Sequence, residues 1–308
     1  MCRGVWNGLK TGYRPLLWSA AALVLLFSIA VPGVNVLTIT FLMVPYVVLY
    51  TMLPAAAFAV HMLVIWVAGY LLIGPAALIV GLFFLIPGIV MGQLYKKKAS
   101  ARTAITGGTL ALLAQFLLEL LILQFAFDIA LLSEMGNIIR ENIATLSRDG
   151  LMPGNWTADM TEELIRTSMQ SLPVMLIIVS FVYAAVTHFL ARRALRTAGI
   201  EVAAFPQAKD WMLPRSFVFY YLIVILFDLF MTTKDNTYFS VVIINLLPLL
   251  RFAFTVQAIG FFFFLAAQKN WPRVVPLLLT VPVLLFPPLS LIGVIDVAFP
   301  LRKSFTKP

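Results

Sequence analysis

Long apolar runs alternate with short polar segments along the whole chain. A run of about 20 apolar residues is long enough to cross the hydrocarbon core of a bilayer as a helix. Charged residues, Pro or Gly bound each run, and such residues commonly mark the ends of helices. The nine runs cover residues 15–31, 34–53, 55–73, 75–95, 104–127, 172–191, 216–232, 238–268 and 274–299. The pattern predicts an all-α fold, a polytopic integral membrane helix bundle.

The last run differs from the others because four prolines interrupt residues 274–299, two of them as the Pro287–Pro288 pair. Proline lacks a backbone N–H and kinks or ends a helix. A full ninth pass would also place Arg302 and Lys303 on the side of the membrane that is poor in basic residues. We therefore expect about eight spans and a Pro-broken C-terminal segment that turns back to the side from which it came.

Basic residues gather on one side of this arrangement. Fourteen of the 22 Lys and Arg lie in segments on the same side as the N-terminus, whereas four lie on the opposite side together with eight acids. Short loops rich in Lys and Arg are retained in the cytoplasm. The distribution predicts a multi-pass membrane protein with both termini cytoplasmic. It also makes the net charge of +9 a signal of topology rather than of a nucleic-acid partner.

The longest polar stretch, residues 128–171, falls on the side with few basic residues. Residues 131–146 and 158–169 both have the apolar periodicity of amphipathic helices, and a breaker at Asp149–Gly154 separates them. The stretch is typical of a structured extracytoplasmic cap on the membrane surface, or of a lid over a site.

Composition and motifs offer little support for catalysis. Hydrophobic residues make up 62% of the chain and the mean hydropathy is +0.99, which leaves too little polar surface for a sizeable soluble domain. A metal site needs clustered ligands, but His61 and His188 lie in different runs and Cys2 lies at the terminus. No Gly-Lys-Ser/Thr phosphate-binding loop is present. We expect no enzymatic activity, no cofactor and no metal, and we expect the two histidines to serve in helix packing.

Glu119, Asp228 and Arg251 are charged residues deep inside apolar runs. Counted from the cytoplasmic boundary at Arg102, Arg215 and Lys269, they lie 17, 13 and 18 residues into their runs, which places them at depths of about 20–27 Å at the rise of an α-helix. Charges in hydrocarbon are costly and generally pair inside a bundle, so the matched depth predicts one polar cluster. Its members are Gln115, Glu119, Asp228, Asn245, Arg251 and Gln257. The cluster is interpreted as a salt bridge that locks helices together, as an outward-facing pocket for a small solute, or as a proton-coupled pathway.

Small residues form a stripe along the fourth run, at Ala77, Gly81, Gly88 and Gly92. Small side chains let the backbones of membrane helices approach closely. The stripe predicts tight helix packing inside the bundle, with docking of another membrane subunit as the alternative.

Several short stretches spread along the chain are distinctive: Pro32, Leu42–Tyr46, Trp211–Arg215, Gln257–Gly260 and Gly293–Arg302. In these stretches the chain resembles the YybS-like family of uncharacterised bacterial membrane proteins. That family is distantly similar to the S components of energy-coupling-factor vitamin transporters, which bind a solute near the outer face of the membrane.

The resemblance implies a six-helix S-component-like bundle in residues 1–197, with the extracytoplasmic cap at 128–171, and appended membrane helices in residues 198–308. It also implies a transmembrane coupling subunit and ATPases as partners, besides the lipid bilayer and an unknown small solute. Two functions follow as hypotheses: a small-solute-binding or transport component without its own ATPase, and a non-transporting membrane scaffold that assists the assembly of other proteins.

Overall fold

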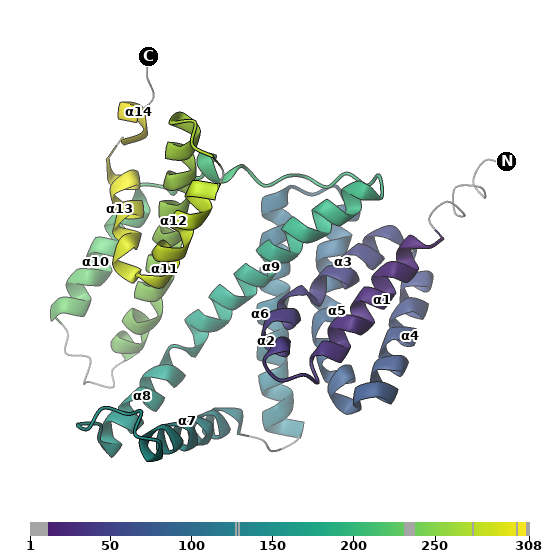
Figure 1. Cartoon of the computed structure of the whole chain (residues 1–308), viewed down its shortest axis with the longest axis horizontal. Coiled ribbons are helices and arrows are strands. Elements are labelled where there is room, and N and C mark those ends of the chain that lie inside the picture. The colour runs from purple at the N-terminus through teal and green to yellow at the C-terminus, as the bar shows by residue number, and fades with distance from the viewer. Residues whose placement is uncertain are drawn as a thin grey trace. The chain divides into compact units, whose positions relative to one another are not determined.

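The computed structural model describes residues 12–126, 128, 130–230, 238–272, 274–299 and 301–305. Every regular element among these residues is a helix (Figure 1). The chain divides into two compact units. The first comprises Met1–Ile129 with Val179–Phe205, and the second comprises Ala130–Ile178 with Pro206–Pro308.

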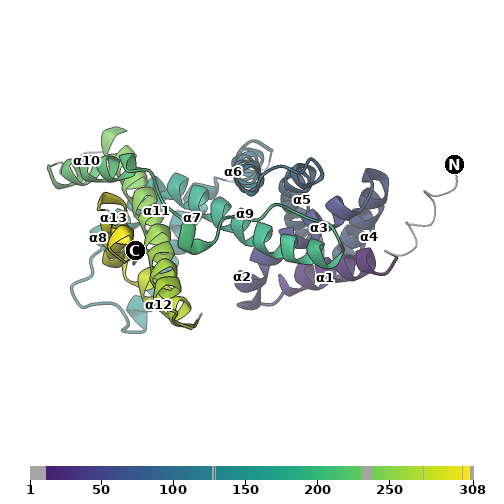
Figure 2. The same cartoon turned by 90° about the horizontal axis from the view of Figure 1, so that it is seen from above.

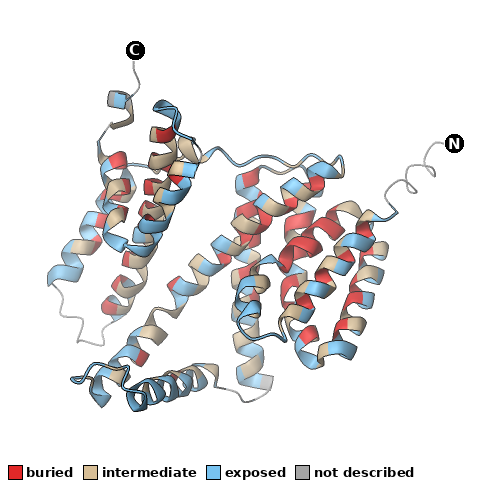
Figure 3. Ribbon diagram, viewed as in Figure 1, coloured by how far each residue is buried: buried red, intermediate tan, exposed pale blue. Residues whose placement is uncertain are grey.

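The first unit is built around a short helix that is buried on all sides. Its helices are α1 (Arg14–Ser28), α2 (Val34–Thr38), η2 (Ile39–Phe41), α3 (Met43–Met52), α4 (Ala55–Ile73), α5 (Pro75–Lys96), α6 (Ala101–Ala126) and most of α9 (Leu172–Thr197). Residues Met43–Leu49 of α3 are almost wholly buried, and α1, α4 and α5 pack around them (Figure 3). A helix that is apolar on every side belongs in the interior of a bundle.

The second unit is organised around one long helix, α11. Its helices are α7 (Leu131–Arg148), α8 (Ala158–Gln170), the start of α9, η3 (Ala208–Asp210), α10 (Ser216–Phe230), α11 (Tyr238–Gln268), α12 (Val274–Leu285), η4 (Pro287–Leu289), α13 (Ser290–Ala298) and α14 (Leu301–Phe305). Helices α10, α12 and α13 all pack against α11 (Figures 1 and 2). Phe254 at the centre of α11 is fully buried.

The helices confirm the predicted all-α membrane fold. Six segments of the described chain are long and apolar enough to cross a membrane: Val34–Met52, Ala55–Ile73, Pro75–Lys96, Ala101–Phe125, Leu172–Thr197 and Tyr238–Gln268. Two further apolar helices, Arg14–Ser28 and Ser216–Phe230, have 15 residues each. Each is about 22 Å long, shorter than a hydrocarbon core of about 30 Å.

The predicted Pro-broken segment is confirmed at the end of the chain. Helices α12 and α13 are bent by 119° relative to each other. The break falls at Pro287 and Pro288, where neither residue has an N–H to continue α12. The two half-helices therefore fold back toward each other rather than forming one straight span.

The polar stretch after α6 forms the two amphipathic helices α7 and α8. Gly150, with φ +68°, lies in the connection between them, and Thr157 caps α8 by accepting from the Met160 N–H at 3.3 Å. Arg140 on α7 donates two hydrogen bonds to the carboxylate of Glu162 on α8, at 2.6 and 2.9 Å. These hydrogen bonds hold the pKa of Glu162 below its usual value.

Contacts place Ala130–Ile178 in the second unit. The expected domain division instead grouped the cap at 128–171 with the bundle of residues 1–197. Ala130–Ile178 belongs to the second unit because α8 packs against α11.

Small residues on α5 allow two neighbouring helices to approach closely. A Cβ atom added at Gly88 would lie 3.0 Å from Cβ of Tyr46 on α3, and one added at Gly92 would lie 2.8 Å from Cδ1 of Tyr50. Gly81 faces the indole of Trp66 on α4, where an added Cβ would lie 2.8 Å from Nε1. The contact between α3 and α5 therefore depends on the absence of side chains.

Substituting Gly88→Val should lower the free energy of unfolding by about 1–3 kcal/mol, because the new side chain overpacks the contact with Tyr46. Thermal unfolding of the purified protein in detergent measures the loss. Gly154→Val is the matched control, since an added Cβ there meets no atom within 4 Å. Equal melting temperatures for the two variants would contradict the close packing of α3 on α5.

Candidate solute site

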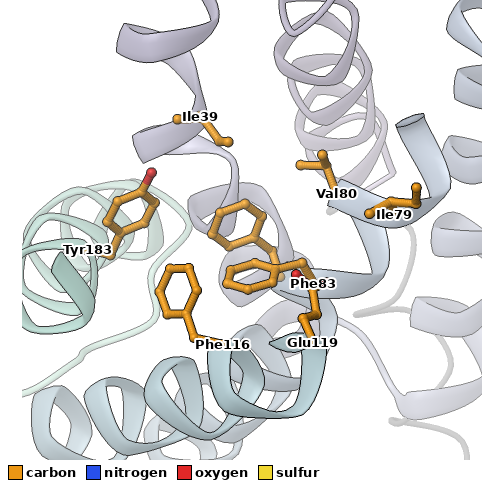
Figure 4. Close-up of a pocket in the computed structure, with 8 residues that line it drawn as sticks. Ile39, Ile79, Val80, Phe83, Phe116, Glu119 and Tyr183 are labelled. Carbon is orange, nitrogen blue, oxygen red and sulfur yellow. The ribbon is translucent and has the colours of Figure 1, made fainter. Parts of the chain in front are cut away.

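The first unit contains a cavity of about 200 Å³ within its helices (Figure 4). Helices α5 and α6 supply most of the lining, and η2 and α9 complete it. The lining residues are Ile39, Ile79, Val80, Phe83, Phe84, Phe116, Glu119 and Tyr183.

The helical repeat brings these side chains to one wall. Phe116 and Glu119 are three residues apart on α6 and therefore share a face, as do Ile79 and Phe83 on α5. The rings of Phe83 and Phe116 lie 4.8 Å apart between centroids. The rings of Phe84 and Tyr183, which also line the cavity, are stacked with centroids 5.8 Å apart. The cavity is therefore walled mainly by aromatic rings.

Glu119 is the charged residue of this lining. Its side chain is half-buried and lies beside Phe83 and Phe116 in the cavity (Figure 4). The three ion pairs formed between described residues do not include Glu119. One turn earlier on α6, Gln115 is 8% exposed. A carboxylate among aromatic rings at membrane depth is costly unless a positive or hydrogen-bonding group meets it.

The other four candidate residues belong to the second unit. Asp228 lies on α10 and Arg251 on α11, and both are exposed within that unit. Neither takes part in an ion pair between described residues. Asn245 and Gln257 lie on α11 and bind other partners, as set out below. The single cluster of all six residues stays a prediction.

Asn245 fills a gap in the backbone hydrogen bonding at the junction of α8 and α9. Its Nδ2 donates to the carbonyl of Gln170 at 2.8 Å, and its Oδ1 accepts from the Val174 N–H at 3.0 Å. In an unbroken helix Val174 would donate directly to Gln170, four residues earlier. The side-chain amide is inserted between these two groups, which satisfies both at a helix break.

Gln257 belongs to a buried polar network that also contains an ion pair. Its Nε2 donates to Oδ2 of Asp296 at 2.6 Å, and its Oε1 accepts from the Leu213 N–H at 3.0 Å. Arg302 donates to the Asp296 carboxylate through Nε and Nη2, the latter at 2.8 Å, and through Nη1 to the carbonyl of Lys209 at 2.7 Å. Asp296 and Gln257 are each only 1% exposed. The network ties α11, α13 and the loop of residues 206–215 together.

Sequence analysis missed the ion pair of Asp296 and Arg302. A usable signal was present, because Asp296 is the one acid in the apolar run 274–299 and a basic residue follows it six positions later. The bond from Arg302 to Lys209 also places the end of the chain beside the loop of residues 206–215. The broken segment therefore returns to the end of the second unit where that loop lies.

Three of the distinctive sequence stretches meet at this network. They are Trp211–Arg215, Gln257–Gly260 and Gly293–Arg302. The backbone N–H of Leu213 donates to the side chain of Gln257, which in turn donates to the carboxylate of Asp296. Gly260 packs against the backbone of Ala208, where an added Cβ would lie 2.9 Å from the carbonyl oxygen. A cavity of about 230 Å³ adjoins the network, lined by Met212, Leu213, Arg215, Asp296, Val297, Phe299 and Arg302.

The two histidines each face a hydroxyl group within the first unit. His61 Nδ1 lies 2.7 Å from Oγ of Ser19, between α4 and α1. His188 Nδ1 lies 2.9 Å from the hydroxyl of Tyr95, between α9 and α5. These contacts join neighbouring helices and lie apart from the lining of the cavity.

Comparisons with known proteins place both units in one family. Residues 19–297 match the family described as "Predicted membrane protein (DUF2232)". The uncharacterised protein YybS of Bacillus subtilis strain 168 is 21% identical over 299 residues, which cover 94% of this chain and 96% of that one. No solved structure shows a significant match.

Substituting Arg302→Leu should lower the free energy of unfolding by about 3–5 kcal/mol, because it leaves the carboxylate of Asp296 buried without its cation. The double variant Asp296→Leu/Arg302→Leu should lose less than the single one, since no charge is then stranded. Chemical unfolding in detergent compares them. Arg140→Leu, which removes an exposed ion pair, is the control and should change stability little. A double variant as unstable as Arg302→Leu would contradict a buried ion pair.

Proposed function

Because this chain belongs to the DUF2232 family of predicted membrane proteins, we propose that this multi-pass membrane protein binds a small solute and acts as a component of a transport system rather than as an enzyme. The observation that carries the proposal is the cavity that contains Glu119 in the first unit. An ionisable residue at membrane depth is a functional candidate by default, because its burial is costly to keep.

Four polar residues of the second unit differ from Glu119, because each of them has a hydrogen-bond or ion-pair partner within that unit. The side-chain amides of Asn245 and Gln257 form hydrogen bonds with backbone atoms, and that of Gln257 also donates to Asp296. Asp296 and Arg302 form an ion pair with each other. Each of these groups has a structural role. Glu119 lines a cavity instead, and the ion pairs between described residues do not include it.

Transport by this protein would need an external source of energy. The sequence has no phosphate-binding loop, so we propose that a transmembrane coupling subunit and ATPases act with it, as in the S-component systems that the chain resembles. We place the protein in the bacterial cytoplasmic membrane with both termini in the cytoplasm. The basic segments support this orientation, and it places α7 and α8 on the outer surface.

A search for copurified small molecules tests the proposal. The full chain is extracted from bacterial membranes in mild detergent, purified and denatured, and the released small molecules are identified by mass spectrometry. We expect a small molecule in near-stoichiometric amount, and at least about tenfold less from Val80→Phe, whose larger side chain fills the cavity.

Leu110→Phe is the matched control, because Leu110 lies on the same bundle, on α6, but is 60% exposed; this variant should retain the small molecule. Equal recovery from Val80→Phe would contradict the proposed site. Repeated absence of any small molecule, together with stably copurifying proteins, would support the membrane scaffold instead.

A further inference from the structure

We propose that the cavity selects a small organic cation, with its positive nitrogen beside Glu119 and an apolar body of about one ring against the aromatic walls. This inference rests on the proposed solute-binding function and names the chemical class of the solute. It is carried by three features of the cavity: its charge, its aromatic walls and its size.

The charge in the lining of the cavity is negative and comes from Glu119. Of the eight lining residues, Glu119 is ionisable at neutral pH and the other seven are aliphatic or aromatic. Helix α6 carries no basic residue after Arg102, and the ion pairs between described residues leave Glu119 out. A lipid chain in this cavity would suit the walls but would leave the carboxylate against hydrocarbon. An anionic solute would be repelled, whereas a cation neutralises Glu119.

The aromatic walls favour the same class of ligand. Phe83, Phe84, Phe116 and Tyr183 all line the cavity. The face of an aromatic ring carries partial negative charge and attracts ammonium groups, most strongly where water is excluded. A carboxylate and several ring faces around one volume are therefore complementary to a cation that also has apolar surface.

The size of the cavity limits the ligand. An apolar cavity of about 150 Å³ in another protein holds benzene, so about 200 Å³ accommodates one ring with a short charged substituent. A divalent metal ion fits poorly, because Ca²⁺ takes six to eight oxygen ligands and this lining offers oxygens from Glu119 and Tyr183 only. A nucleotide or a dinucleotide cofactor is too large.

The test compares three monocyclic probes that differ in charge. Benzyltrimethylammonium, benzyl alcohol and benzoate are titrated into the full chain in detergent by isothermal calorimetry, with protein-free detergent as the blank. We expect benzyltrimethylammonium to bind at least about tenfold more tightly than benzyl alcohol, and benzoate not to bind. Glu119→Gln should remove this preference and leave the affinity for benzyl alcohol unchanged. Glu141→Gln, which removes an exposed acid on α7, should bind like the unmodified protein.

Two further variants keep the test decisive. Phe116→Leu retains the charge but removes one ring, so it should weaken the binding of the cation even if Glu119→Gln fails to fold. Arg251→Gln should leave the binding of the cation unchanged. A gain of affinity in Arg251→Gln would mean that Arg251 neutralises Glu119, and this would overturn the inference.

The outcomes also separate this inference from the proposed function. Binding of benzyl alcohol or benzoate that Val80→Phe abolishes, without a preference for the cation, would retain a solute site and overturn its selectivity. Equal affinity of the unmodified protein and Glu119→Gln for the cation would do the same. Failure of every probe to bind, together with no copurified small molecule, would overturn both.

Discussion

A backbone inside hydrocarbon has no water to bind, so each of its N–H and C=O groups must find a partner within the protein. The same requirement applies to buried backbone wherever helices break, and the second unit shows how it is met. At the junction of α8 and α9, the side chain of Asn245 takes the place of one helical hydrogen bond. Beside the loop of residues 206–215, Gln257 accepts from the Leu213 N–H. Polar side chains on α11 thus form hydrogen bonds with the backbone groups that are left unpaired where other helices break.

The same constraint separates structural polar groups from the functional candidate. Asn245 and Gln257 are engaged by backbone groups, and the Asp296 carboxylate has Arg302 beside it. Glu119 differs because its surroundings are the rings of a cavity. The three sequence stretches that meet at Gln257 therefore have a structural role. The proposed solute site lies in the first unit, where the walls of the cavity are almost entirely apolar.

Sequence predicted the helices well because apolar run length and proline position are properties of the chain alone. The nine runs correspond to helices, and Pro287 and Pro288 mark the 119° break. The depth of a residue in the membrane also follows from its number, because an α-helix rises by about 1.5 Å per residue. The direction in which a side chain points, and the helix that meets it, depend on packing. The contacts of Gln257 with Asp296 and Leu213, and the aromatic rings beside Glu119, therefore do not follow from the sequence pattern alone.

The bond from Arg302 to Lys209 joins residues 93 positions apart. Lys209 is synthesised well before Arg302 and cannot accept this hydrogen bond until Arg302 has been added. Until Arg302 emerges, the carboxylate of Asp296 has no cation and the half-helices α12 and α13 have no anchor beside η3. Folding of the second unit is therefore completed only after Arg302 has been synthesised, and a chain that stops before Arg302 would leave the carboxylate of Asp296 without its cation.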